Sequence, residues 1–151
     1  MKFSDVIIAT AALVLFALIL DAILQVAFVP LKPNTTSEWL SFIISILVVS
    51  LVVGYVFALN IQQESRVKAV LGIAVLTSLL TIFFFAIWIA SPFGSPWFKD
   101  SLSSAINTSG WTDYQWSAYT ALLVSLDVLI SFVLSFIGLY AGSMLKKAKK
   151  T

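Results

Sequence analysis

The chain has 151 residues, of which 60% are hydrophobic and 11% charged, and its formal net charge is +2. Soluble domains are roughly 45–50% apolar and 25% charged, so a soluble core of this size could not hide so much apolar surface, whereas lipid can. The absence of cysteine and histidine excludes disulfides, metal sites built on thiolates or imidazoles, and His-based catalytic triads. We therefore expect a membrane protein without metal, cofactor or nucleic-acid partner.

Four apolar stretches are each long enough to cross a bilayer as a helix, which takes about 20 residues. They cover residues 6–29, 39–59, 69–90 and 115–144. A cleaved signal peptide has a shorter apolar core of roughly 7–15 residues, so we expect the first stretch to be retained. The predicted fold is all-α: a four-helix transmembrane bundle that forms one domain over residues 1–151.

The longest connection between predicted spans is the second outer loop, residues 91–117, and it carries helix signals of its own. Ser95 followed by Pro96 is a good helix start, and apolar residues recur after it at helical spacing. This pattern predicts a short amphipathic helix that lies in the membrane interface. Thr112 and Gln115 have the spacing of a capping box, which predicts the start of the fourth span.

The basic residues place both termini in the cytoplasm. In that orientation only Lys32 and Lys99 are outside, and the other seven of the nine Lys and Arg residues are inside, where membrane proteins carry their excess. The five tryptophans then fall at or near the outer ends of the spans, where an aromatic belt belongs: Trp39, Trp88, Trp97, Trp111 and Trp116. We expect an integral protein of the plasma membrane.

Two Asn-x-Ser/Thr patterns lie in the predicted outer loops, at Asn34 and Asn107. Such a pattern is an acceptor for N-glycosylation in a secreted or surface protein, and an unmodified loop asparagine is an equal alternative because short patterns arise by chance. Asn34 lies very near the membrane, so Asn107 is the better candidate.

Each predicted span carries a polar side chain at about the same depth, in the outer half near the midplane. A helical rise of 1.5 Å per residue puts these side chains roughly 12–17 Å below the outer ends of their spans. Gln25 and Ser131 share a helix face with the two acids. The sequence thus predicts an intramembrane polar layer, serving proton or cation passage or docking, made of Asp21, Gln25, Ser50, Thr81, Asp127 and Ser131.

Small residues extend these polar faces along the spans. Gly54 follows Ser50 at a spacing of four residues in the second span, and Ser135, Gly138 and Gly142 follow one another in the fourth. Small residues at such spacing let membrane helices approach closely, and the last two form a G-x-x-x-G pattern. We expect them to pack the four helices together, and a homodimer through the two glycines is the alternative.

The two acids pose an electrostatic problem, because no Lys, Arg or His lies within a span to pair with them. An ionised Asp near the bilayer centre costs at least about 2.5–3.5 kcal/mol. Three arrangements remain open: the acids are protonated and hydrogen-bond neighbouring groups, they bind a cation in a wet cavity, or they meet a basic residue of another subunit. If Asp21 and Asp127 face each other, they share one proton, as in a proton relay.

These features leave three classes of function. The first is a non-enzymatic accessory or scaffold subunit of a larger membrane complex, favoured by the small size, the aromatic outer loop and the lack of a catalytic constellation. The alternative is a small proton- or cation-coupled transporter or channel that uses Asp21 and Asp127. A membrane enzyme ranks last, since acid–base catalysis would rest on two carboxylates alone. Expected partners are the bilayer and other membrane subunits, and a homo-oligomer stays open.

Overall fold

The computed structural model describes residues 3–28, 35–57, 66–92, 99–100, 103 and 106–148. Within these residues the chain forms long helices and no strand. The helices are α1 (Phe3–Phe28), α2 (Thr35–Phe57), α3 (Arg66–Ala90) and α5 (Asp113–Ala148). All four are long and apolar enough to span a membrane, so the predicted all-helical class is confirmed.

The start of α5 is fixed by the predicted capping box, which is confirmed. The backbone N–H of Thr112 donates to Oε1 of Gln115 at 2.9 Å, and the backbone N–H of Gln115 donates to Oγ1 of Thr112 at 3.4 Å. A turn precedes the box, in which Gly110 has a φ of 83°, a conformation that favours glycine. From this start α5 runs for 36 residues, or about 54 Å, well beyond a hydrocarbon core of about 30 Å.

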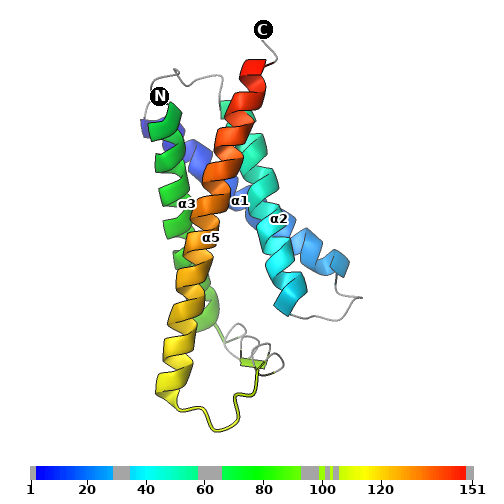
Figure 1. Cartoon of the computed structure of the whole chain (residues 1–151), viewed down its shortest axis with the longest axis vertical. Helices are drawn as coiled ribbons and strands as arrows, with labels where there is room; N and C mark the ends of the chain where they lie inside the picture. Colours follow the sequence, from blue (N-terminus) through cyan, green and yellow to red (C-terminus); the bar gives the residue numbers. More distant parts are fainter. Residues whose placement is uncertain are drawn as a thin grey trace.

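The helices pack as a closed ring in the order α1, α2, α5, α3, with α3 returning to α1. Consequently α1 and α5 occupy opposite corners of the ring. The start of α1 and the end of α5 lie at the same end of the molecule, at the top of Figure 1. The end of α3 and the start of α5 lie toward the other end, which we call the far end, whereas the end of α1 and the start of α2 lie to one side at an intermediate height.

The closest helix contact is between α2 and α5, and glycines make it. A Cβ atom added to Gly54 would lie 2.7 Å from the Cα atom of Leu139, and one added to Gly138 would lie 2.9 Å from the Cβ atom of Ser50. A Cβ atom on Gly142 would lie 2.8 Å from the backbone nitrogen of Tyr55. The two backbones therefore touch where the sequence places its small residues.

Toward the far end α2 and α5 diverge. Figure 1 shows the two helices crossing, after which the start of α2 (cyan) and the start of α5 (yellow) lie well apart. The first half of α5 instead runs beside α3, which packs against it. As a result α5 is covered by α2 only along its second half, and this difference positions the candidate site.

Large apolar side chains cover much of the outside of the helices. Phe16, Phe83 and Leu129 are each more than half exposed, at 57%, 59% and 58%. An apolar exterior of this kind suits contact with hydrocarbon. Of the predicted short helix after Ser95, residues 99–100 and 103 have helical backbone, Ile106 is in a bend, and residues 95–98, 101–102 and 104–105 lie outside the described residues.

Candidate functional site

Asp21 is held by hydrogen bonds within the chain. The hydroxyl of Ser41 on α2 donates to Oδ1 of Asp21 at 2.7 Å, and Nε2 of Gln25, one helical turn along α1, donates to Oδ2 at 2.8 Å. Ser41 is fully buried, whereas Asp21 is half-buried and Gln25 exposed. Both carboxylate oxygens thus have a donor, and the carboxylate ties α1 to α2.

Asp127 has a different environment. It is half-buried on α5, and it makes no hydrogen bond or ion pair with any part of the chain that the structure describes. The hydroxyl of Ser131, one turn further along the same helix face, donates instead to Oγ1 of Thr81 on α3 at 3.3 Å. The Asp127 carboxyl group therefore lies within a long apolar helix, and its hydrogen-bonding capacity is not used by any of the described residues.

Four of the six residues of the expected polar layer fall into two separate clusters. Asp21 and Gln25 belong to the α1–α2 side, and Thr81 and Ser131 link α3 to α5. Because α1 and α5 are opposite corners of the ring, the two acids do not meet. The contacts also differ in position along the helices, since Asp21 bonds Ser41 whereas Ser50 lies against Leu134 and Gly138. The order of the helices around the ring could not be read from the sequence.

The small residues of the second and fourth spans serve packing within one chain. The hydroxyl of Ser50 is fully buried and donates to the backbone oxygen of Leu47 at 3.0 Å, and it also lies 3.5 Å from the backbone oxygen of Leu134 on α5. The hydroxyl of Ser135 donates to the backbone oxygen of Ser131 at 2.6 Å. Both glycines of the G-x-x-x-G pattern lie against α2. The side of α5 that carries them is therefore already covered within the same chain.

Three aromatic rings gather at the start of α5. The ring of Trp111 meets those of Trp116 and Tyr119 edge-on, with centroids 5.2 Å and 5.4 Å apart. Nζ of Lys99 lies 5.7 Å from the Trp116 ring, within cation–π range. The side chains of Trp39, Trp88 and Trp97 lie outside the described residues, so the structure places two of the five predicted belt residues.

The candidate glycosylation site at Asn107 is exposed. Its Oδ1 accepts hydrogen bonds from the backbone N–H of Ser109 at 3.1 Å and from the Ser109 hydroxyl at 2.7 Å. The asparagine and the hydroxyl residue of the pattern are thus in direct contact on an accessible loop. Asn34 lies outside the described residues.

Sequence reasoning missed a second set of buried hydroxyls. Ser41 was overlooked although it supplies one of the two donors to Asp21. Ser45, one turn further along α2, and Thr77 on α3 are also buried, and their hydroxyls have no hydrogen-bond partner among the described residues. The spacing of four residues between Ser41 and Ser45 was a readable signal, because it marks one face of a helix.

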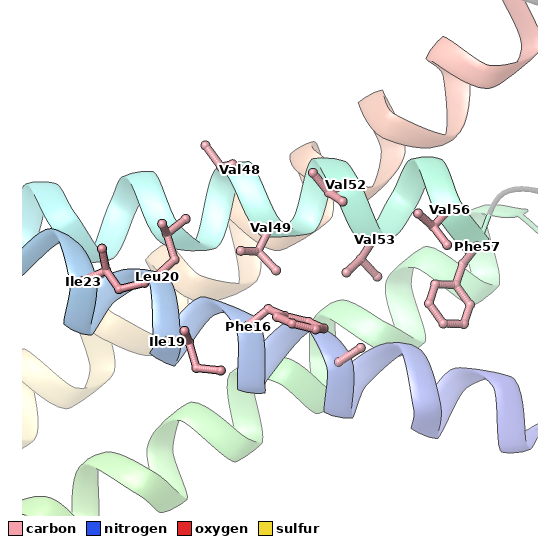
Figure 2. Close-up of a pocket in the computed structure, with 11 residues that line it drawn as sticks. Phe16, Ile19, Leu20, Ile23, Val48, Val49, Val52, Val53, Val56 and Phe57 are labelled. Atoms are coloured by element: carbon pink, nitrogen blue, oxygen red, sulfur yellow. The ribbon is translucent and has the colours of Figure 1, made fainter.

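An open groove of about 420 Å³ runs between α1 and α2. Figure 2 shows its walls, with Phe16 and Ile19 from α1 and a row of valines from α2. All the residues that line it are apolar: Ala12, Phe16, Ile19, Leu20, Ile23, Val48, Val49, Val52, Val53, Val56 and Phe57. Such a surface suits hydrocarbon and offers nothing to hold an ion or a polar substrate.

Among the described residues, few groups other than Asp127 could bind a ligand or carry a proton. They contain no group of three or more acids that could hold a metal ion. Asp127 can carry a proton or accept hydrogen bonds from a donor that comes from outside the chain. Neither a protein-family model nor a curated protein nor a solved structure matches this chain.

Proposed function

We propose that this protein is a non-enzymatic accessory subunit of a larger complex in the plasma membrane. The four long apolar helices support insertion as four spans. The arrangement of the start of α1 and the end of α5 at one end of the molecule fits an even number of crossings, and the excess of lysine and arginine at that end favours the cytoplasm for both termini.

The observation that carries this proposal is the environment of Asp127. An ionisable side chain within a membrane span is costly and normally has a partner or a function. Asp127 has no partner within the part of the chain that the structure describes, while Asp21 has two. An accessory subunit meets this requirement naturally, because its partner supplies the missing donor when the complex assembles.

The transporter alternative has less support from the geometry. A relay through both acids needs them close enough to exchange a proton directly or through a short chain of groups. Asp21 and Asp127 lie on opposite corners of the helix ring, and the groove between α1 and α2 is lined by apolar residues alone. We therefore rank transport second.

The aromatic cluster of Trp111, Trp116 and Tyr119 fits the outer interface of the membrane in this proposal. Tryptophan and tyrosine collect at headgroup level, where the ring is partly buried and its polar atom stays hydrated. The exposed loop that contains Asn107 then faces the outside. A short amphipathic helix between residues 95 and 106 would complete this interface.

The proposal is tested by purifying the chain from its native membranes at its natural expression level, in a mild detergent. We expect other membrane proteins to accompany it in a fixed ratio. A lone monomer or homodimer would contradict the proposal. In that case, proton and cation flux into liposomes, compared between the wild type and a variant with Asn at both acids, would test the transporter alternative.

A further inference from the structure

We propose that Asp127 pairs with a lysine or arginine in a transmembrane helix of a different polypeptide, and that this helix packs along the first half of α5. The inference rests on the proposed function and names the partner's chemistry. It makes Asp127 the docking residue of this chain and assigns Asp21 to the chain's own packing.

One face of α5 is only partly covered within the chain. Asp127, Ser131 and Gly138 lie on one side of the helix, and Thr120 and Val124 extend that side toward the far end. Along the second half of α5 this face is buried against α2, with Ser131 fully buried. Along the first half, Thr120, Val124 and Asp127 are only half-buried, because α2 has diverged from α5 there (Figure 1). This face of α5 extends along both halves of the helix, but α2 covers only the second half.

Asp127 meets no opposite charge from the described residues. Within the membrane, carboxylates are tolerated when they meet an opposite charge or strong donors. Asp127 lies 11 residues along α5 from Trp116, a depth of about 16 Å. Neither hydrogen bonds nor ion pairs reach it from the described residues. A cationic side chain from outside would supply what this position lacks, and its stem would pack on the surrounding apolar side chains.

A second copy of this chain does not fit that requirement. All its lysines and arginines lie outside the apolar parts of the predicted spans. Arg66 and Lys68 lie in the first turn of α3, at the end of the molecule that holds the termini, and Lys99 lies over the Trp116 ring at the start of α5. No basic residue of a parallel second copy would reach the depth of Asp127, so the partner is another polypeptide.

Photo-crosslinking in native membranes tests the packing. A photoreactive amino acid at Leu123, one turn before Asp127, is compared with one at Leu129, which is exposed on the opposite side of α5. We expect the probe at Leu123 to capture another polypeptide whose crosslinked helix carries a lysine or arginine, and the probe at Leu129 to capture it much less. Capture of a second copy of this chain at Leu123, of lipid alone, or of a helix without a basic residue would overturn the inference.

The charge itself is tested by substitution. Asp127→Asn should lower the amount of co-purified partner about tenfold, and Asp127→Glu should retain it. The charges can also be exchanged, with Asp127→Lys in this chain and an acid in place of the partner's basic residue. This double change should restore the amount of co-purified partner. Equal membrane levels and equal unfolding midpoints of the variants exclude a folding defect.

Two failures are distinguishable in this experiment. If wild type and Asp127→Asn co-purify the same subunits in the same amount, the ion pair is wrong and the accessory function stands. If the wild type co-purifies no other subunit, the accessory function itself is wrong.

Discussion

Ser41 on α2 donates a 2.7 Å hydrogen bond to Asp21 on α1. This contact distinguishes Asp21 from Asp127, although the two acids look alike in the sequence. Each acid is the single acidic residue within the apolar stretch of its helix, because the other acid of each helix, Asp5 or Asp113, lies in the first turn. One is built into a helix–helix contact, with donors on both oxygens, and the other is left without a donor among the described residues. The same side chain therefore has two different environments in this structure, and the first prediction below uses each acid as the control for the other.

Replacing each acid by leucine should have different effects on the stability of the isolated chain. Asp21→Leu removes the acceptor of Ser41 and Gln25, and we expect the free energy of unfolding to fall by about 1–3 kcal/mol. Asp127→Leu breaks no hydrogen bond within the described residues and removes a polar group from apolar surroundings, so stability should stay the same or rise. Unfolding midpoints in detergent measure both. A loss of similar size in the two variants would contradict the assignment.

The hydroxyls of Ser41 and Ser45 provide a matched pair one helical turn apart. Both are buried, but Ser41 bonds Asp21 whereas the Ser45 hydroxyl has no partner among the described residues. We expect Ser41→Ala to cost about 0.6–1.7 kcal/mol, the range for hydrogen bonds between membrane helices. Ser45→Ala should be neutral or stabilising. Equal costs in the same unfolding assay would show that the contact with Asp21 contributes nothing specific.

The contact between α2 and α5 should tolerate no added methyl group. Gly138→Ala would bring its Cβ atom into Ser50, so the two helices must separate, at a cost of about 1–3 kcal/mol. The control is Gly72→Ala, whose Cβ atom would lie 3.9 Å from Cγ1 of Val6, an ordinary contact. That variant should gain up to about 1 kcal/mol from helix propensity. If both variants unfold at the same point, the close approach is wrong.

Glycosylation provides a test of topology. Produced in a eukaryotic cell, the protein should carry one glycan at Asn107, because this loop is accessible and is assigned to the outer side. Ser109→Ala should abolish the modification, because the acceptor pattern requires a hydroxyl residue at this position. Migration on a gel before and after glycosidase treatment reports the result. A modified wild type supports the orientation with both termini in the cytoplasm, and an unmodified one would count against it. If the Ser109→Ala variant is still modified, the glycan is attached at a residue other than Asn107.

Local sequence signals predicted the helices and their ends well. Apolar length and the capping box at Thr112 and Gln115 depend on neighbours in the chain, so the sequence shows them directly. The spacing of Gly54 and Gly138 likewise indicated a close helix contact, and the structure shows which two helices make it.

The arrangement of the helices around the ring was not predictable, because faces of similar composition on four helices allow several orders. That order decides which polar residues meet, and it separates Asp21 from Asp127. The donor from Ser41 was missed for the same reason, since its importance appears only when α1 and α2 are placed side by side. The unequal cover of α5 depends on the angle at which α2 crosses it, and the spacing of the small residues does not by itself give that angle.

The most direct test of the account is the reactivity of a single cysteine at Leu123, in a chain that has no cysteine of its own. The rate of labelling by a membrane-permeant maleimide is measured in the gently purified native particle and again in the isolated chain. Leu129→Cys, on the exposed side of α5, serves as the reference. The account predicts that the thiol at position 123 is protected in the native particle and reactive in the isolated chain, while the thiol at position 129 reacts equally in both. Equal labelling at position 123 in the two preparations would contradict the claim that a partner covers α5 at Asp127.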